Sequence, residues 1–350
     1  MLPLRIPVSA EGTNHIQGIA IDKDRKYVYC SFTTELIKYD MKGNAVGSVK
    51  GLIGHLGCIA YNYDDGKVYG SLEYKHDAIG AGILRNLGSG AVFEEGFYIA
   101  VFDVEKIDRM GMDAERDGVM TAVYMDEVTR DYSAEGHRHG CSGIDGTTFA
   151  PLPGGGGKKY LCVAYGIYGD VERDDNDYQV ILAFDVSDLN SAARPLCQSD
   201  MHRSGPAFKH KYFVYTGNTD YGVQNLEYDP FTNRMFMAVY RGKKPSFPNY
   251  TTFSVDMSIP AEVKPLRGKG ISGETLTLSS DGEHDGKSGV SGWYFNVGST
   301  GIASLGDGYY YFSHNREDYA NKRFYSDIQL YKWDGIAPFR IIEDKEGETK

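Results

Sequence analysis

His15-Ile-Gln-Gly-Ile-Ala-Ile-Asp22, followed by Tyr27-Val-Tyr-Cys30, is the first of five copies of one sequence pattern. Each copy has a short apolar strand, a turn built on Asp, Gly or Asn, and a second strand rich in Tyr. The other first strands begin at His55, Cys141, Val223 and Thr300. A sheet unit repeated at long spacing cannot bury its own faces, so neighbouring copies must stack. Five four-stranded units closing into a ring predict an all-β fold, a five-bladed β-propeller.

The repeat places the whole chain, residues 1–350, in one domain with about 70 residues per blade. The expected blades, each with four antiparallel strands, span about 15–51, 55–130, 140–217, 222–297 and 300–342. We expect Leu4–Val8 to pair with the last blade and close the ring, because closure removes exposed sheet edges. Phe339–Ile342 is expected to be the last strand of blade five. For the fourth strand of blade three the sequence leaves two alternatives, Arg194–Gln198 and Lys211–Tyr215. Val104–Asp117 is the one plausible helix, and a polar loop is an equal alternative there.

Composition narrows the class of partner. The net charge of −11 argues against a nucleic acid or an anionic membrane surface, which a basic stripe would recognise. We therefore expect a small-molecule or oligosaccharide ligand. No secretory signal follows Met1 and no run of 18 apolar residues occurs, which predicts a cytoplasmic protein, or a periplasmic or secreted one if a signal peptide has been removed. The five cysteines form no CxxC pair and are expected to be buried thiols.

The loops between second and third strands meet the connections into each blade on one face of the ring. These loops are long (73–97, 166–178, 242–251 and 314–327), and long loops on a rigid scaffold often carry function. Six of the nine histidines fall on this expected face. The candidate site residues gathered there include His137, Tyr165, Tyr168, Tyr74, Tyr221, Lys75, Arg241, His314 and Arg316. The tyrosines are candidates for stacking on sugar rings or for acid catalysis, although most of the 27 must pack between blades.

A metal shell is one interpretation of the histidines. His15 and His55 lie three residues before the equivalent Gly18 and Cys58, and His139 lies four before Gly143. Equivalent positions converge on the axis, where imidazoles from separate blades, with the amide oxygen of Gln224, suit Mn, Zn, Fe or Ni. Alternatively, each imidazole caps backbone groups at the mouth of the ring.

Carboxylates give a second set of candidates. Asp145 and Glu227 stand where the other copies carry Ala, and burying a carboxylate there is costly unless it is paired. They are therefore either functional or part of buried ion pairs between blades. Glu73, at the end of a second strand, is placed to reach a substrate. The acidic run Asp170–Asp177 has oxygens for calcium but lacks the spacing of a calcium loop, so we expect a solvated loop and consider calcium the less favoured metal.

The predicted architecture resembles the five-bladed propellers found among carbohydrate-active proteins. The grouping of His15, His55, His139 and Gln224 is similar to the metal shell of oligogalacturonate lyases, which are seven-bladed. This resemblance implies a metal-assisted lyase that breaks a C–O bond of an acidic or oxidised oligosaccharide by β-elimination. In this scheme His137, Tyr165 or Tyr168 removes the proton, and Lys75, Arg241 or Arg316 binds the negative charge.

Two other functions stay open at this point. Glu73 with Asp145 or Glu227 would serve as the acid and base of a glycoside hydrolase. The chain would also suit a non-catalytic sugar-binding or scaffold propeller, because fold alone does not determine function.

Overall fold

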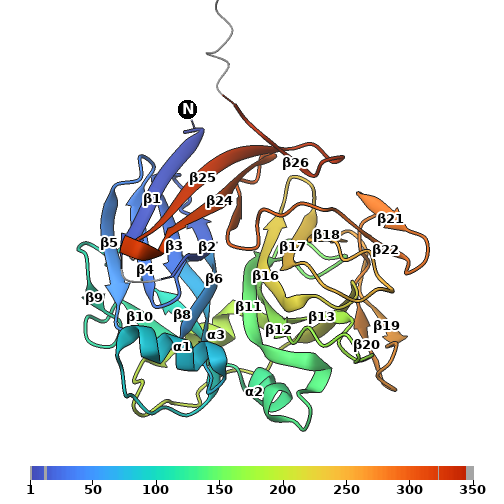
Figure 1. Cartoon of the computed structure of the whole chain (residues 1–350), viewed down its shortest axis with the longest axis horizontal. Helices are drawn as coiled ribbons and strands as arrows, with labels where there is room; N and C mark the ends of the chain where they lie inside the picture. Colours follow the sequence, from blue (N-terminus) through green and yellow to red (C-terminus); the bar gives the residue numbers. More distant parts are fainter. Residues whose placement is uncertain (1, 12–13, 322, 344–350) are drawn as a thin grey trace, which may run out of the picture.

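The computed structural model describes residues 2–11, 14–321 and 323–343. Five sheets stand in a ring and form a five-bladed β-propeller, which confirms the predicted fold class (Figure 1). The innermost strand of each blade is the first in chain order. These inner strands are β2 (Ile16–Ile21), β6 (His55–Asn62), β11 (Cys141–Ala150), β16 (Asp220–Asp229) and β23 (Ile302–Ser304). Each contacts the next around the axis, and β23 returns to β2.

Blade five closes the ring with strands from both terminal regions. β1 (Arg5–Glu11) pairs with β25 (Arg323–Trp333) in an antiparallel register that matches Arg5 with Gln329, as the red and dark blue strands of Figure 1 show. β26 (Phe339–Ile341) pairs with the remaining part of β25, and β24 (Tyr309–Asp318) lies on its other side. The predicted closure is confirmed, but the outer edge of this blade is shared: β1 covers most of it and β26 only its end.

The other blades add strands outward from the axis. Blade one continues with β3 (Tyr27–Phe32), β4 (Glu35–Asp40), β5 (Ala45–Lys50) and β9 (Met112–Asp113). Blade two continues with β7 (Lys67–Tyr74), β8 (Gly96–Phe102), β10 (Met120–Tyr124) and β14 (Arg194–Pro195). Blade three continues with β12 (Tyr160–Ile167), β13 (Tyr178–Asp185), β15 (His210–Tyr215), β20 (Ser272–Thr275) and β19 (Glu262–Pro265). Of the two alternatives for blade three, the second is therefore correct, while Arg194–Pro195 belongs to blade two.

Blade four has the most irregular outer edge. β17 (Arg234–Tyr240) and β18 (Thr252–Asp256) complete a three-stranded sheet with β16. The expected fourth strand at 293–297 is reduced to a single bridge between Trp293 and Thr252. The short hairpin of β21 (Glu283–Asp285) and β22 (Val290–Gly292) lies beside it.

The helices of the structure lie outside the stretch 104–117 that the sequence suggested. They are α1 (Ala78–Leu87), α2 (Asp126–Ser133) and α3 (Val186–Ala192), with 3-10 turns η1 (Arg138–Gly140) and η2 (Tyr319–Asn321). Of the two possibilities for 104–117, the loop is correct: the segment consists of turns and the short strand β9. There the Asp113 carboxylate accepts the backbone N–H groups of Glu115 and Arg116, which favours a turn over a helix. α1 begins where Asp77 caps the N–H groups of Ile79 and Gly80.

Large aromatic side chains fill the space between blades. Tyr74, Tyr98, Phe102 and Tyr165 are almost completely buried, and each such side chain contributes about 1.5–3 kcal/mol by its burial. No helix in the described part of the chain has the length and apolar character that a membrane crossing needs.

The inner strands approach one another closely at mid-height of the axis. A methyl group at Gly18 would lie 2.8 Å from Cys58 Cα, so only glycine allows this contact between β2 and β6. Thr147 Oγ1 donates to the Cys58 carbonyl at 3.1 Å, and Asn225 Nδ2 donates to the carbonyls of Gln17 and Ser299. These bonds link blade three to blade two, and blade four to blade one and to the segment that enters blade five. One cavity is lined by the strand starts and another by the strand ends.

Candidate functional site

The cavity at the starts of the inner strands measures about 400 Å³ and is called here the axis-mouth cavity. Residues from blades one to four and from α1 line it: Asn14, His15, Gln17, Thr33, His55, Glu73, Lys75, Ala78, Ile79, Gly82, Ile83, Asn86, Ser142, Asp145, Tyr221, Gln224 and Tyr240. Seven of these are residues that the sequence selected as site candidates: His15, His55, Glu73, Lys75, Asp145, Tyr221 and Gln224. The structure therefore brings together side chains that lie up to about 200 residues apart in the chain.

β-Bulges direct several of these side chains toward the axis. The pairing of each of the first four inner strands with its neighbour shifts register near the strand start, around Gln17 in β2, Gly57 in β6, Ser142 and Asp145 in β11, and Gln224 in β16. A bulge leaves a residue unpaired and re-aims its side chain. This is the local reason why polar residues reach the axis in strands whose alternation would otherwise present Ala and Ile.

Glu73 and Lys75 form a buried ion pair in the wall of the cavity. Lys75 Nζ lies 2.8 Å from Glu73 Oε2 and donates to the Ser142 carbonyl at 3.0 Å, and the backbone N–H of Ile144 donates to Glu73 Oε1 at 2.6 Å. Burial alone would raise the pKa of Glu73, but the nearby charges of Lys75 and His55 outweigh it and hold that pKa below its ordinary value. Glu73 is thus a fixed anion, and Lys75 is its counter-ion.

Asp145 has the opposite electrostatic environment. Burial, with the negative charge of Glu73 as a second cause, raises the pKa of Asp145 to about 7. Gln224 Nε2 donates to its Oδ2 at 3.1 Å. Near neutral pH this carboxyl group therefore holds a proton much of the time and is able to give it to a bound molecule.

Two histidines lie on the cavity wall. His55 Nδ1 is buried and lies 3.5 Å from Glu73 Oε2, a long contact, while the exposed 14% of the side chain faces the cavity. His15 Nδ1 lies 3.4 Å from Glu317, and its Nε2 lies 3.4 Å from Gln17 Nε2. Burial lowers the pKa of His15 despite the nearby Glu317, so this imidazole is mostly neutral at pH 7.

Glycines make room for the two carboxylates. Gly143 has φ +129°, and a methyl group there would overlap Glu73 Oε1. At Gly57 a methyl group would lie 2.7 Å from Asp145 Oδ1. The glycines at these positions are therefore required by the site itself.

Two of the predicted tyrosines lie elsewhere. Tyr74 is completely buried and its hydroxyl donates to Gln198 at 3.0 Å, while the buried Tyr165 donates to Asp131 at 2.9 Å. The prediction that they lie on the loop-bearing face is wrong, because strand alternation turns both side chains into the packing between blades. Tyr221 does line the cavity, half exposed and with φ +63°.

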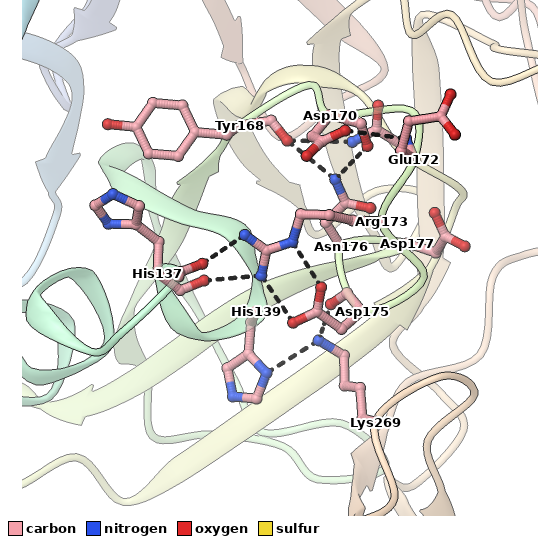
Figure 2. A network of polar contacts seen from close by, with 12 residues as sticks. His137, His139, Tyr168, Asp170, Glu172, Arg173, Asp175, Asn176, Asp177 and Lys269 are labelled. Atoms are coloured by element: carbon pink, nitrogen blue, oxygen red, sulfur yellow. Dashed lines mark hydrogen bonds and ion pairs between the residues drawn. The ribbon is translucent and has the colours of Figure 1, made fainter.

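His137 and His139 belong to a separate network (Figure 2). His139 packs its ring on Phe213, and its Nδ1 lies 2.9 Å from Lys269 Nζ. Burial and the positive charge of Lys269 lower its pKa to about 3. The His137 ring packs against Tyr168 at a tilt of 57°, with ring centres 5.0 Å apart, and its Nδ1 forms a hydrogen bond with the Tyr132 carbonyl. The expected shared shell of His139 with His15 and His55 is wrong, because the η1 turn carries His139 away from the axis and Asp145 reaches it instead.

The acidic run 170–177 binds cations of the protein itself. Arg173 pairs with Asp175 at 2.8 Å and donates to the His137 carbonyl, as Figure 2 shows. Lys244 Nζ contacts the Arg173 carbonyl, Asn176 Oδ1 and Asp177 Oδ1. An ammonium group thus occupies the cluster of oxygens that suggested calcium. The segment is an irregular and largely exposed loop, as expected, and these contacts attach it to the rest of the blade.

The remaining candidates lie outside the lining of the axis-mouth cavity. Arg241 is exposed and its guanidinium lies 5.2 Å from the centre of the Tyr294 ring. Arg316 pairs with Asp327 at 2.9 Å, and His314 Nε2 lies 2.9 Å from the Tyr331 hydroxyl. Glu227 lines the other cavity, at the ends of the inner strands, so it is not available as a partner of Glu73.

Three of the four expected metal ligands (His15, His55 and Gln224) line the axis-mouth cavity. Within the described residues, however, no three His, Cys, Asp or Glu side chains are grouped closely enough to hold a metal ion. Sequence reasoning also missed Tyr240 and the α1 wall. The Asp77 cap and Gly88, which ends α1 at φ +62°, were the available signals for that helix.

No protein-family model and no curated protein matches this sequence. Among solved structures, the PQQ domain of pyranose dehydrogenase from Coprinopsis cinerea is 10% identical, covering 89% of this chain and 81% of its own, with a TM-score of 0.38. A functionally unknown protein from Desulfotomaculum acetoxidans is 10% identical over 94% of this chain and 69% of its own (TM-score 0.36). Hydrazine synthase from Kuenenia stuttgartiensis is 12% identical over 92% and 64% (TM-score 0.33). Similarity at this level assigns neither a substrate nor a reaction.

Proposed function

We propose that the axis-mouth cavity is the active site of a carbohydrate-active enzyme that hydrolyses a glycosidic C–O bond. The supporting observation is that a proton-holding carboxyl, Asp145, and an imidazole backed by a fixed anion, His55 with Glu73, line one cavity. Pairs of titratable groups with opposite environments are how an active site separates its acid from its base.

Each residue has one role in this reaction. Asp145 donates its proton to the glycosidic oxygen while the bond from that oxygen to the anomeric carbon breaks. His55 Nε2 takes a proton from a water molecule whose oxygen attacks the same carbon, so the products are an alcohol and a free sugar. The Glu73 carboxylate, whose Oε2 lies 3.5 Å from His55 Nδ1, stabilises the imidazolium that forms. Solvent then exchanges the protons and restores both groups.

The charges in the cavity favour a neutral sugar over an acidic one. Lys75 is the cation nearest the reacting groups, and Glu73 at 2.8 Å already neutralises it. The other expected cations, Arg241 and Arg316, contact Tyr294 and Asp327 instead. The half-exposed ring of Tyr221 is placed to stack on a sugar face.

Leaving-group dependence tests the role of Asp145. With a panel of aryl glycosides, we expect Asp145→Asn to slow release of phenol by about 10²–10⁴-fold, because general acid catalysis contributes that much. Release of 2,4-dinitrophenol, which needs no protonation, should fall far less. For the wild-type protein kcat should decline above about pH 7, where Asp145 loses its proton.

Asp200→Asn, at an exposed turn, is the matched control and should leave every rate unchanged. An equal loss with both leaving groups would contradict the role of Asp145. Absence of turnover on every glycoside, with sugar binding retained, would favour a binding propeller.

The neutral imidazole of His15 favours a second candidate, elimination from a uronate-containing oligosaccharide, because a neutral imidazole is able to remove a proton. Elimination leaves a conjugated double bond that absorbs in the ultraviolet, whereas hydrolysis does not. Running the same assay with a chelator, and then with Mn, Zn, Fe or Ni restored, tests the metal-assisted form of this reaction. Loss and recovery of turnover would support the metal, and unchanged turnover would reject it.

A further inference from the structure

The ends of the five inner strands surround a second cavity of about 230 Å³, called here the far cavity. Its lining comes from all five blades: Ile19, Ala20, Ile21, Ile59, Ala60, Tyr61, Tyr63, Thr148, Phe149, Lys159, Glu227, Tyr228, Pro230, Ala303, Ser304, Leu305 and Gly306. We infer that the far cavity is a second binding site, for the anion of a small carboxylic acid with an apolar body. This inference does not depend on the function proposed for the axis-mouth cavity.

The size and walls of the far cavity determine the body of the ligand. Apolar cavities of about 150 Å³ are known to bind a single benzene molecule, so this cavity holds one ring or a branched aliphatic chain. Ile19, Ile59, Ala303 and Leu305 provide apolar walls, with Phe149 among the aromatic side chains beside them. Transfer of the ligand's apolar surface from water into this cavity is favourable.

Glu227 provides a hydrogen-bond donor. Its Oε1 accepts the Ser304 N–H at 2.7 Å, while Oε2 lies 3.4 Å from Thr148 Oγ1, which leaves Oε2 with capacity for a ligand. Burial, with Asp229 adding negative charge, raises the pKa of Glu227 to about 8 in spite of the Ser304 hydrogen bond. At neutral pH this side chain is an uncharged acid that donates to a carboxylate oxygen.

Lys159 provides the charge. Its Nζ lies 5.7 Å from the centre of the Tyr63 ring, and among the described residues it forms no ion pair. Since Glu227 is neutral, Lys159 is the charged group of the cavity lining at pH 7. Lys159 therefore repels a bound cation and forms no ion pair with a neutral molecule. A carboxylate pairs with Lys159 and accepts a hydrogen bond from Glu227.

Three probes with one ring and different charges test this inference: benzoate, benzyl alcohol and benzylamine, each titrated into the intact protein at pH 7 by ligand-observed NMR. We expect benzoate to bind about tenfold more tightly than benzyl alcohol, and benzylamine most weakly. Lys159→Met should remove the preference for benzoate, and Ala303→Leu should remove binding of all probes by filling the cavity. Equal affinity for benzoate and benzyl alcohol, or binding unaffected by Ala303→Leu, would overturn the inference.

A pH series provides a test that does not depend on a cavity-filling variant. The titratable or charged groups that face Glu227 are Asp229, Lys159, Tyr63, Tyr310 and Cys58. Burial raises the pKa of Tyr63, Tyr310 and Cys58, so none of these three ionises near pH 8. Wild-type affinity for benzoate should fall up to about tenfold per pH unit above pH 8, as Glu227 ionises. Glu227→Gln, which stays neutral and keeps a donor, should hold its affinity to pH 9.5; a parallel decline in both proteins would overturn the role of Glu227.

Discussion

The two ends of the propeller axis are formed by the same five inner strands, yet they present different surfaces. At the axis mouth, register shifts in three strands turn Gln17, Asp145 and Gln224 inward. Toward the far cavity the pairing is regular from Gly18 to Ile21 and from Ile59 to Asn62, and the inward residues are mainly Ala and Ile. The comparison teaches that irregular backbone adds Gln17, Asp145 and Gln224 to the polar groups that the strand starts and β7 already supply.

The two ends also treat a carboxylate differently. Glu73 at the axis mouth has Lys75 at 2.8 Å and remains ionised. Glu227 in the far cavity has hydrogen bonds but no cation within ion-pair distance among the described residues, and its pKa rises to about 8. One residue type thus becomes an anion at one end and an acid at the other, according to its partners.

The largest expected difference between the two ends concerns their lysines. Lys75→Met leaves the Glu73 charge buried without its partner and should lower the free energy of unfolding by about 3–5 kcal/mol. Lys159→Met at the far cavity breaks no ion pair and should change it by about 0.5 kcal/mol or less. Urea denaturation at pH 7 measures both.

The double variant Lys75→Met with Glu73→Gln should recover most of the loss, because no unpaired charge remains. If Lys75→Met and Lys159→Met lower the free energy of unfolding equally, the proposed electrostatic difference between the two ends is wrong.

A smaller effect is expected from the glycine that accommodates Glu73. Gly143→Ala places a methyl group on Glu73 Oε1 at φ +129°, so it combines backbone strain with overlap. Gly118→Ala, at φ +63° with open space around it, has the strain alone and should cost about 1–2 kcal/mol. Thermal unfolding should show Gly143→Ala to be less stable than this control. Equal midpoints would mean that Glu73 moves aside without cost.

The pH dependence of stability gives the most specific test. The native state holds a proton on Glu227 between about pH 4.5 and 8, where the unfolded chain has released it. Stability present below pH 4.5 is therefore lost as pH rises through this range, by up to about 1.4 kcal/mol per unit. Glu227→Gln should remove this slope, while Asp145→Asn should remove only a similar contribution that ends near pH 7. Chemical denaturation between pH 5 and 8.5 measures the slopes, and identical slopes in all three proteins would contradict both raised pKa values.

The sequence predicted the structure correctly where equivalent positions of the repeat determine the strands and the placement of side chains. The strand patterns predicted five blades and the closing contact of residues 4–8, and the strand starts correctly placed His15 and His55 in one cavity. The predicted position of His139 was wrong because this residue lies in a turn before its strand, at φ +61°. A comparison of the repeats does not show that turn. The predicted positions of Tyr74 and Tyr165 were wrong because a tyrosine at a strand end faces either the axis or the next blade. Only the strand register decides between these two directions.

The pairing of β1 with β25 joins residues more than 300 positions apart, so this contact of the ring forms only after β25 has been synthesised. During synthesis, residues 5–11 are made long before their partners at 323–329, and they remain unpaired until those partners are available. Blades one to four must therefore persist during synthesis with an open edge, a state in which an unpaired strand is able to join another chain. We expect nascent or refolding protein to be most prone to self-association in this interval, and the completed ring to be protected from it.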